Sequence, residues 1–259
     1  MRKLQSNLYS NGQGETSQIL RGMFMSPNPP LEAWTFLKQE VRLRGSTGAA
    51  LRTLPGGRRV VVKRGGSAGG DRAGHIKNEY DMNRYLNELG VGVPNARMVE
   101  EKGKPTMLTD FEEGATAPIF SEGGNYGMTR KVRDRLRQDF VPHALIGNWD
   151  VLGMDADNAL IRPDGTPTYV DVGGAGPYRA QGAPKGGAFG PSVSDLDTMQ
   201  YMPPYTEMVY GNMSPEELGQ SYDAHGGLDA MTDATKVIQD PRTQQIMNQR
   251  AQDLARRVA

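Results

Sequence analysis

The sequence predicts an α+β fold of two lobes, a small antiparallel sheet followed by a mostly helical lobe. Short β-type segments separated by glycine turns fill residues 41 to 63, and two more follow between residues 91 and 111. The composition changes sharply at residues 112 to 118, and helical patterns interrupted by proline and glycine dominate the end of the chain. We therefore expect an arm with a short docking helix over 1–40, a sheet lobe over 41–113 and a helical lobe over 114–259.

The sheet lobe is expected to contain five strands and one helix. Three strands come first, over 41–44, 49–54 and 58–63, separated by turns at Gly45-Ser46-Thr47-Gly48 and Pro55-Gly56-Gly57. A helix follows, because Ile76, Tyr80, Asn83, Leu86 and Leu89 share one face, and Gly90 is a typical helix stop. Two further strands are expected over 91–99 and 106–111.

The helical lobe begins with one expected helix of about four turns, marked by Val132, Leu136, Phe140 and Leu145. A β-hairpin follows, with strands at 159–161 and 168–170 around the turn residues 162–165. The glycine-rich stretch 173–191 predicts a loop. The remaining helices should be interrupted at Pro203-Pro204, Pro215, Gly226-Gly227 and Pro241.

Composition limits the possible functions. The 259 residues include 30 Lys+Arg, 30 Asp+Glu and no cysteine. Balanced charge argues against a dedicated nucleic-acid binder, and the lack of cysteine excludes disulfides, thiolate metal sites and cysteine nucleophiles. No apolar run is long enough for a membrane span or a signal peptide. We expect a cytoplasmic protein, and delivery as an effector or phage protein is compatible with this.

Three oxygen-bearing residues are expected at one edge of the helical lobe. Asp150 follows a helix, Asn158 leads into the first hairpin strand, and Asp171 ends the second. Carboxylate and amide oxygens without thiolates or imidazoles suit Mg²⁺. Taken singly, each residue is more typical of a turn cap, an Asx-turn or a strand end. As an ordered set they predict a magnesium site.

The sheet lobe contributes a lysine and a glutamate. Lys63 closes an apolar strand, and Glu79 lies on the helix face that should pack on the sheet, so the two can form an ion pair. Alternatively, both side chains point into solvent. The backbone N–H groups of Gly45, Ser46, Thr47 and Gly48 can approach phosphates, although the same residues also make an ordinary hairpin turn.

This order of residues resembles the order of motifs in proteins with the protein-kinase-like fold. The resemblance is closest to the atypical branch that includes HipA-type serine/threonine kinases and phosphatidylinositol 4-kinases. The segment Leu-Ile-Gly-Asn-Trp-Asp at 145–150 is similar to the HipA catalytic-loop entry. Asp171-Val-Gly-Gly stands where the family has its metal-binding aspartate. Residues 106–114 resemble the hinge that contacts adenine.

The resemblance implies an ATP·Mg²⁺-dependent phosphotransferase acting on a Ser or Thr hydroxyl of a protein substrate. It implies that Lys63, paired with Glu79, holds the α- and β-phosphates and that Asp150 orients the acceptor hydroxyl and takes its proton. Asn158 and Asp171 would carry Mg²⁺. The hinge backbone around Leu108, Asp110 and Phe111 would contact adenine.

The sequence also departs from the kinase pattern. Asp150 and Asn158 are eight positions apart, which indicates an expanded loop or a shared role for Asp155 or Asp157. No His-Arg precedes Asp150, and no Ala-Pro-Glu ends an activation segment. Arg179 either lies over the acceptor site or is an ordinary loop arginine. Two alternatives stay open, an inactive kinase-shaped assembly protein and a kinase-fold enzyme that transfers AMP.

Overall fold

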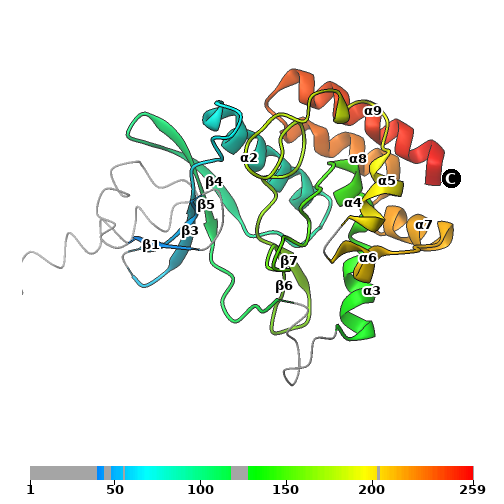
Figure 1. Cartoon of the computed structure of the whole chain (residues 1–259), viewed down its shortest axis with the longest axis horizontal. Coiled ribbons are helices and arrows are strands. Elements are labelled where there is room, and N and C mark those ends of the chain that lie inside the picture. The colour runs from blue at the N-terminus through cyan, green and yellow to red at the C-terminus, as the bar shows by residue number, and fades with distance from the viewer. Residues whose placement is uncertain (1–39, 44–47, 55, 118–127, 203–204, 259) are drawn as a thin grey trace, which may run out of the picture.

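The protein has a sheet lobe and a helical lobe (Figure 1). The computed structural model describes residues 40–43, 48–54, 56–117, 128–202 and 205–258. The expected arm and docking helix over 1–40 lie outside the described residues except for Glu40, which begins the first strand, and Gly45, Ser46 and Thr47 lie outside them as well. None of the helices in the described part of the chain has the length and hydrophobicity to cross a bilayer.

The sheet lobe holds five antiparallel strands in the order β1-β2-β3-β5-β4. The strands are β1 (Glu40–Arg42), β2 (Ala50–Thr53), β3 (Arg59–Lys63), β4 (Ala96–Glu101) and β5 (Lys104–Asp110). The strand expected over 91–99 starts five residues late, at Ala96. The N–H of Val91 bonds to the carbonyl of Leu86 (3.0 Å) and completes the helix end instead. Pro94, which has no N–H to donate, also delays sheet pairing.

Helix α2 (Arg72–Glu88) lies against the sheet and also belongs to the core of the helical lobe. The Asp71 side chain accepts a hydrogen bond from the N–H of Gly74 and caps the helix start. Gly90, at φ +74°, reverses the chain after the helix, as the sequence predicts. Buried Met82, Tyr85 and Leu86 join the main hydrophobic core, so one helix fixes the position of the sheet relative to the helical lobe.

The single helix expected over 132–145 is two helices, α3 (Arg130–Gln138) and α4 (Phe140–Leu145). Asp139 separates them, with φ −92° and ψ 2°. The physical reason is Pro142, which cannot donate to a carbonyl one turn back and whose ring would clash with the carbonyl of Gln138 in a continuous helix. The prediction of one helix missed this proline.

The hairpin after α4 is as expected, with strands β6 (Ala159–Ile161) and β7 (Pro167–Tyr169). Gly165 takes φ +81° in the turn. An irregular segment follows, which contains η3 (Gly186–Ala188) and an isolated β-bridge between Tyr178 and Pro184. The remaining helices are α5 (Asp195–Thr198), η4 (Met199–Tyr201), α6 (Thr206–Tyr210), α7 (Pro215–Ala224), α8 (Gly227–Ala234), η5 (Thr235–Val237) and α9 (Pro241–Val258).

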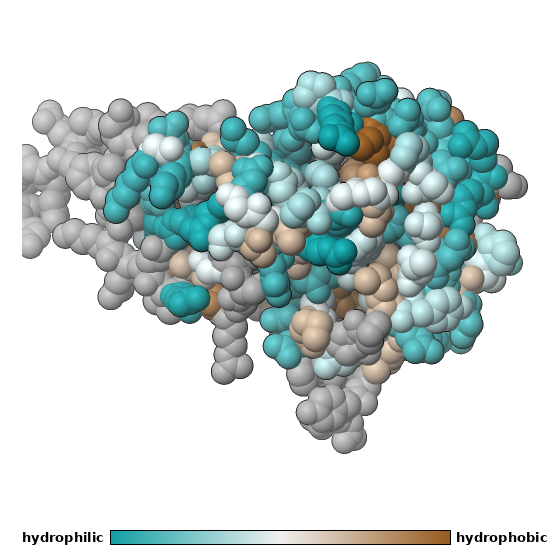
Figure 2. Space-filling model, turned by 45° about the horizontal axis from the view of Figure 1, so that its top comes forward, coloured by the Kyte–Doolittle hydropathy of each residue, from teal (hydrophilic) through white to brown (hydrophobic). Residues whose placement is uncertain are grey.

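The proline and glycine positions set the starts of the last helices. Helices α7, α8 and α9 begin at Pro215, Gly227 and Pro241, the positions where the sequence predicts interruptions. The amphipathic α9 packs on the helical lobe through Met247 and Leu254, both fully buried. The molecular surface in Figure 2 is mainly hydrophilic, with hydrophobic residues in small separate areas.

Candidate active site

Lys63 and Glu79 form a buried ion pair between β3 and α2. The Nζ atom of Lys63 lies 2.5 Å from Oε1 of Glu79, and the two residues are only 4% and 1% exposed. Strand β3 ends at Lys63 after three valines, and Glu79 lies two turns into the buried face of α2. The structure thus contains the ion pair expected from the sequence, and neither side chain points into solvent.

Lys63 also contacts the segment after β7. Its ammonium group donates to the carbonyl of Val170 (2.8 Å) and lies 3.4 Å from Oδ1 of Asp171. Burial lowers the pKa of Lys63, but the carboxylates of Asp171 and Glu79 outweigh burial and raise the pKa above its usual value. The lysine therefore remains positively charged in a site with little water.

The loop after β7 is held tightly against α2. Oδ1 of Asp171 accepts a hydrogen bond from the N–H of Gly173 (3.0 Å). A Cβ atom at Gly173 would lie 3.2 Å from both Asp171 Oδ1 and Glu79 Oε2, so glycine permits this close approach. His75 adds a further tie, because its Nε2–H donates to the carbonyl of Gly173 (2.8 Å) while its Nδ1 accepts from the N–H of Gly66 (2.8 Å). No sequence pattern distinguishes His75 as a residue of this site.

Asp150 and Asn158 are brought together by the loop between α4 and β6. The Nδ2 group of Asn158 donates to the backbone carbonyl of Asp150 (2.7 Å). Gly153, at φ +77°, lets the expanded loop fold back, since a Cβ there would come within 2.9 Å of Asn158 Cγ. Burial raises the pKa of the Asp150 carboxyl to about 6, and the negative charge of Asp171 contributes. Asp150 is thus a stronger base than an ordinary aspartate.

A cleft of about 290 Å³ lies between the two lobes. Its lining includes Val61 and Lys63 from β3, and Asp157, Asn158 and Asp171 from the other lobe. Asp155 is exposed and is not part of this lining. Asp150 does not line the cleft either, but it lies beside it, since its backbone carbonyl accepts the hydrogen bond from Asn158, which lines the cleft.

The expected hinge lines the cleft only in part. Asp110 and Phe111 line it together with Glu112, whereas Leu108 does not. Leu108 is buried against Val60 and Val62 in a small separate core of the sheet. Thr109 also lines the cleft, so the adenine contact that the kinase resemblance implies would involve Thr109 to Glu112. Of the expected phosphate-loop residues only Gly48 is described, at φ +72° and with open space around its Cβ position.

The donor atoms at the cleft fit Mg²⁺. Oδ2 of Asp171 and Oδ1 of Asn158 have no hydrogen-bond partner among the described residues, and both side chains line the cleft. Within that same part of the chain, no group of three His, Cys, Asp or Glu side chains could hold a metal ion. One carboxylate and one amide oxygen suit a metal that takes its other ligands from water and phosphate.

Lys185 is a buried site residue that the sequence analysis missed. Its ammonium group donates to the carbonyls of Gly147 (2.5 Å) and Gly174 (2.8 Å) and lies 4.5 Å from the ring centre of Trp149. Burial lowers the pKa of Lys185 to about 7. The lysine thus joins the segment before Asp150 to the segment after Asp171. It stands in a glycine-rich loop, where no sequence pattern distinguishes it from an exposed lysine.

Two arginines support the same region. The exposed Arg179 stacks on Trp149, the residue before Asp150, with its guanidinium carbon 5.1 Å from the ring centre. The fully buried Arg250 of α9 pairs with Asp195 (2.5 Å) and donates to the carbonyl of Leu145 (2.7 Å) at the end of α4. This second buried pair fixes the helix end from which the Asp150 segment leaves.

Comparisons with known proteins identify the fold. No protein-family model and no curated protein matches the sequence. The crystal structure of CtkA, a proinflammatory kinase of Helicobacter pylori, matches with a TM-score of 0.53 and 11% identity over 86% of this chain and 96% of CtkA. An apo pseudokinase structure matches with a TM-score of 0.35 and 10% identity over 86% of this chain and 91% of that one. The likeness to CtkA and the two lobes described above show that this chain has the two-lobed α+β protein-kinase-like fold.

Proposed function

We propose that this chain is an ATP·Mg²⁺-dependent phosphotransferase of the atypical kinase type that phosphorylates a Ser or Thr hydroxyl of a protein. The observation that carries this proposal is the environment of Lys63, whose ammonium group is fixed by Glu79 and lies 3.4 Å from Asp171 at the cleft. A lysine that is protonated, immobile and shielded from water offers strong electrostatic stabilisation to phosphate oxygens.

The remaining roles are proposed from the positions of the residues in the cleft or beside it. Asn158 and Asp171 would hold Mg²⁺, which would neutralise charge on the phosphate oxygens. Asp150 would orient the acceptor hydroxyl and take its proton, and a pKa of about 6 leaves it mostly ionised at neutral pH. Asp157 lines the cleft and Asp155 does not. Asp157 is therefore the residue that would act beside Asp150 as a base or beside Asn158 as a metal ligand.

The protein acceptor rests on the resemblance of residues 145–150 to the HipA catalytic-loop entry. Because the reaction consumes ATP, we place the protein in a cytoplasm, either of the cell that makes it or of a cell that receives it as an effector.

The test is transfer of label from γ-labelled ATP to dephosphorylated casein, a general Ser/Thr acceptor, and to the chain itself. Asp171→Ala should abolish transfer, because it removes the carboxylate that is proposed to hold Mg²⁺ together with Asn158. The matched control is Asp229→Ala, which removes an exposed aspartate of α8 and should leave transfer unchanged. Undiminished transfer by Asp171→Ala would contradict the proposal.

Thermal unfolding distinguishes the proposed enzyme from a protein that only binds or assembles partners. Stabilisation by ATP that requires Mg²⁺ and is lost in Asp171→Ala supports a nucleotide site. An inactive scaffold without such a site would show no metal-dependent change in melting temperature.

A further inference from the structure

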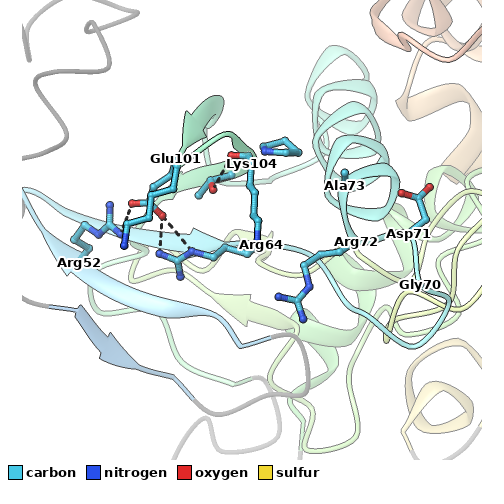
Figure 3. A pocket seen from close by; sticks show the side chains of 11 residues that line it. Arg52, Arg64, Gly70, Asp71, Arg72, Ala73, Glu101 and Lys104 are labelled. Atoms are coloured by element: carbon cyan, nitrogen blue, oxygen red, sulfur yellow. Dashed lines mark hydrogen bonds and ion pairs between the residues drawn. The ribbon is translucent and has the colours of Figure 1, made fainter.

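A second cavity, of about 800 Å³, lies beside the start of α2 (Figure 3). Side chains from β2, from the ends of β3 and β4, from the start of β5 and from the first turn of α2 line it. It is larger than the cleft, which has about 290 Å³. A cavity of this size has room for a small organic ligand.

Most of the strand residues that line this cavity lie on the opposite face of the sheet from the cleft. Side chains alternate between the two faces along a strand, and directly paired residues share a face. Lys63, on the cleft face, pairs with Met107 of β5. Thr106 and Lys104 therefore lie on the other face, and Glu101, which pairs with Lys104, lies there as well. A ligand in this cavity would not share contacts with Lys63.

The cavity lining carries an excess of positive charge. Two of its residues are acidic, Asp71 and Glu101, and five are basic, namely Arg52, Arg64, Arg72, Lys102 and Lys104. The whole chain, by contrast, has equal numbers of acidic and basic residues, 30 of each. A local excess of three positive charges in a concave surface concentrates the field and attracts anions.

Both acidic residues are already engaged within the protein. Asp71 accepts from the N–H of Gly74 (2.8 Å) and from the hydroxyl of Tyr178 (2.9 Å). Burial raises the pKa of Glu101, but hydrogen bonds from Arg64 and Arg52, each 2.8 Å long, outweigh burial and lower it. Figure 3 shows the Glu101 carboxylate between the two guanidinium groups. Glu101 therefore occupies a position that suits an external anion.

Two exposed basic residues complete the lining. Arg72 and Lys104 make no side-chain hydrogen bond or ion pair with the residues that the structure describes. The Arg72 side chain extends from the first turn of α2 toward the sheet (Figure 3). Both can therefore bind a ligand without first breaking a contact to another described residue.

We propose that this cavity binds a small molecule that bears phosphate groups and at least two negative charges. Guanidinium groups bind phosphate through paired hydrogen bonds, and a lysine adds a flexible charge. Ala73 and Pro105 give the cavity a nonpolar wall for the remainder of such a ligand. The proposal stands apart from the proposed phosphotransfer, because it concerns the other face of the sheet.

The test is isothermal titration of pyrophosphate into the full chain, without Mg²⁺ and at constant ionic strength. Arg72→Ala/Lys104→Ala should weaken binding by about tenfold, because it removes two charges that face the ligand. Glu101→Gln should tighten binding by about threefold or more, because it removes a carboxylate that competes with the ligand for Arg52 and Arg64. The control is Lys131→Ala/Arg242→Ala, which removes one exposed lysine and one exposed arginine outside the cavity and should leave affinity unchanged.

Opposite effects of the two cavity variants would support the site, since general weakening of the fold cannot tighten binding. The proposal is overturned if pyrophosphate shows no saturable binding. It is equally overturned if Arg72→Ala/Lys104→Ala binds as the natural chain does, or if the control pair loses as much affinity as the cavity pair.

Discussion

Lys63 Nζ and Glu79 Oε1 lie 2.5 Å apart, and each side chain is almost completely buried. Two opposite charges without water interact strongly, but each has lost its hydration, so the pair stabilises the fold only while both partners are present. The pair also joins the last residue of β3 to the middle of α2. Its expected role in catalysis and its role in stability can be separated by substitution.

Lys63→Met should destabilise the fold by about 3–5 kcal/mol, because it leaves Glu79 buried without a counter-charge. Lys63→Met/Glu79→Leu removes both charges and should recover most of that loss. Urea unfolding measures both changes. Neither variant should gain thermal stability from ATP·Mg²⁺. If the double variant responds to ATP·Mg²⁺ as the natural chain does, Lys63 does not contact the phosphates.

Gly173→Ala should reduce phosphotransfer by about tenfold or more with little loss of stability, because small displacements of reacting groups cost rate. The new Cβ would crowd Asp171 Oδ1 and Glu79 Oε2, both 3.2 Å away. Gly187→Ala is the matched control, since its Cβ would have no atom within 4 Å. Rates from labelled ATP and melting temperatures for both variants check this. Equal rates for the two would show that the Asp171 loop tolerates displacement.

The low pKa of Lys185 predicts that the free energy of unfolding rises with pH above 7. Its pKa is about 7 in the folded protein and 10.5 ordinarily, so between these values the unfolded chain binds one more proton at this residue. Stability contributed by this group therefore rises with pH above 7. From pH 7 to 9 the natural chain should gain about 2 kcal/mol relative to Lys185→Met, at about 1.4 kcal/mol for each pH unit.

Urea unfolding of both chains at the two pH values measures this gain. Lys131→Met, which replaces an exposed lysine of α3, should show no such change relative to the natural chain. A constant difference between the natural chain and Lys185→Met would mean that the buried ammonium stays protonated throughout.

The sequence predicts well those features that depend on local pattern. Glycine and proline positions predict the hairpin turn at Gly165 and the starts of α7 and α9, because glycine readily takes positive φ and proline fixes φ. The pairing of Lys63 with Glu79 is predictable because one residue ends a buried strand and the other lies on the buried face of the following helix.

Other features depend on contacts between distant residues, which local pattern does not contain. Lys185 reaches Gly147, 38 residues earlier, and His75 reaches Gly173, 98 residues later. The break at Asp139 depends on one proline inside a run with helical spacing. Leu108 fits the kinase hinge by sequence position, but strand alternation places it in the sheet core.

The most direct measurement of phosphoryl transfer compares γ-labelled with α-labelled ATP on the natural chain in the presence of Mg²⁺. We expect label from the γ-phosphate on Ser or Thr of the acceptor, no label from the α-phosphate, and loss of transfer when Mg²⁺ is chelated. Label from the α-phosphate would contradict phosphoryl transfer and indicate AMP transfer. Absence of both labels, with no thermal stabilisation by ATP·Mg²⁺, would contradict the proposal that this chain is an ATP-dependent enzyme.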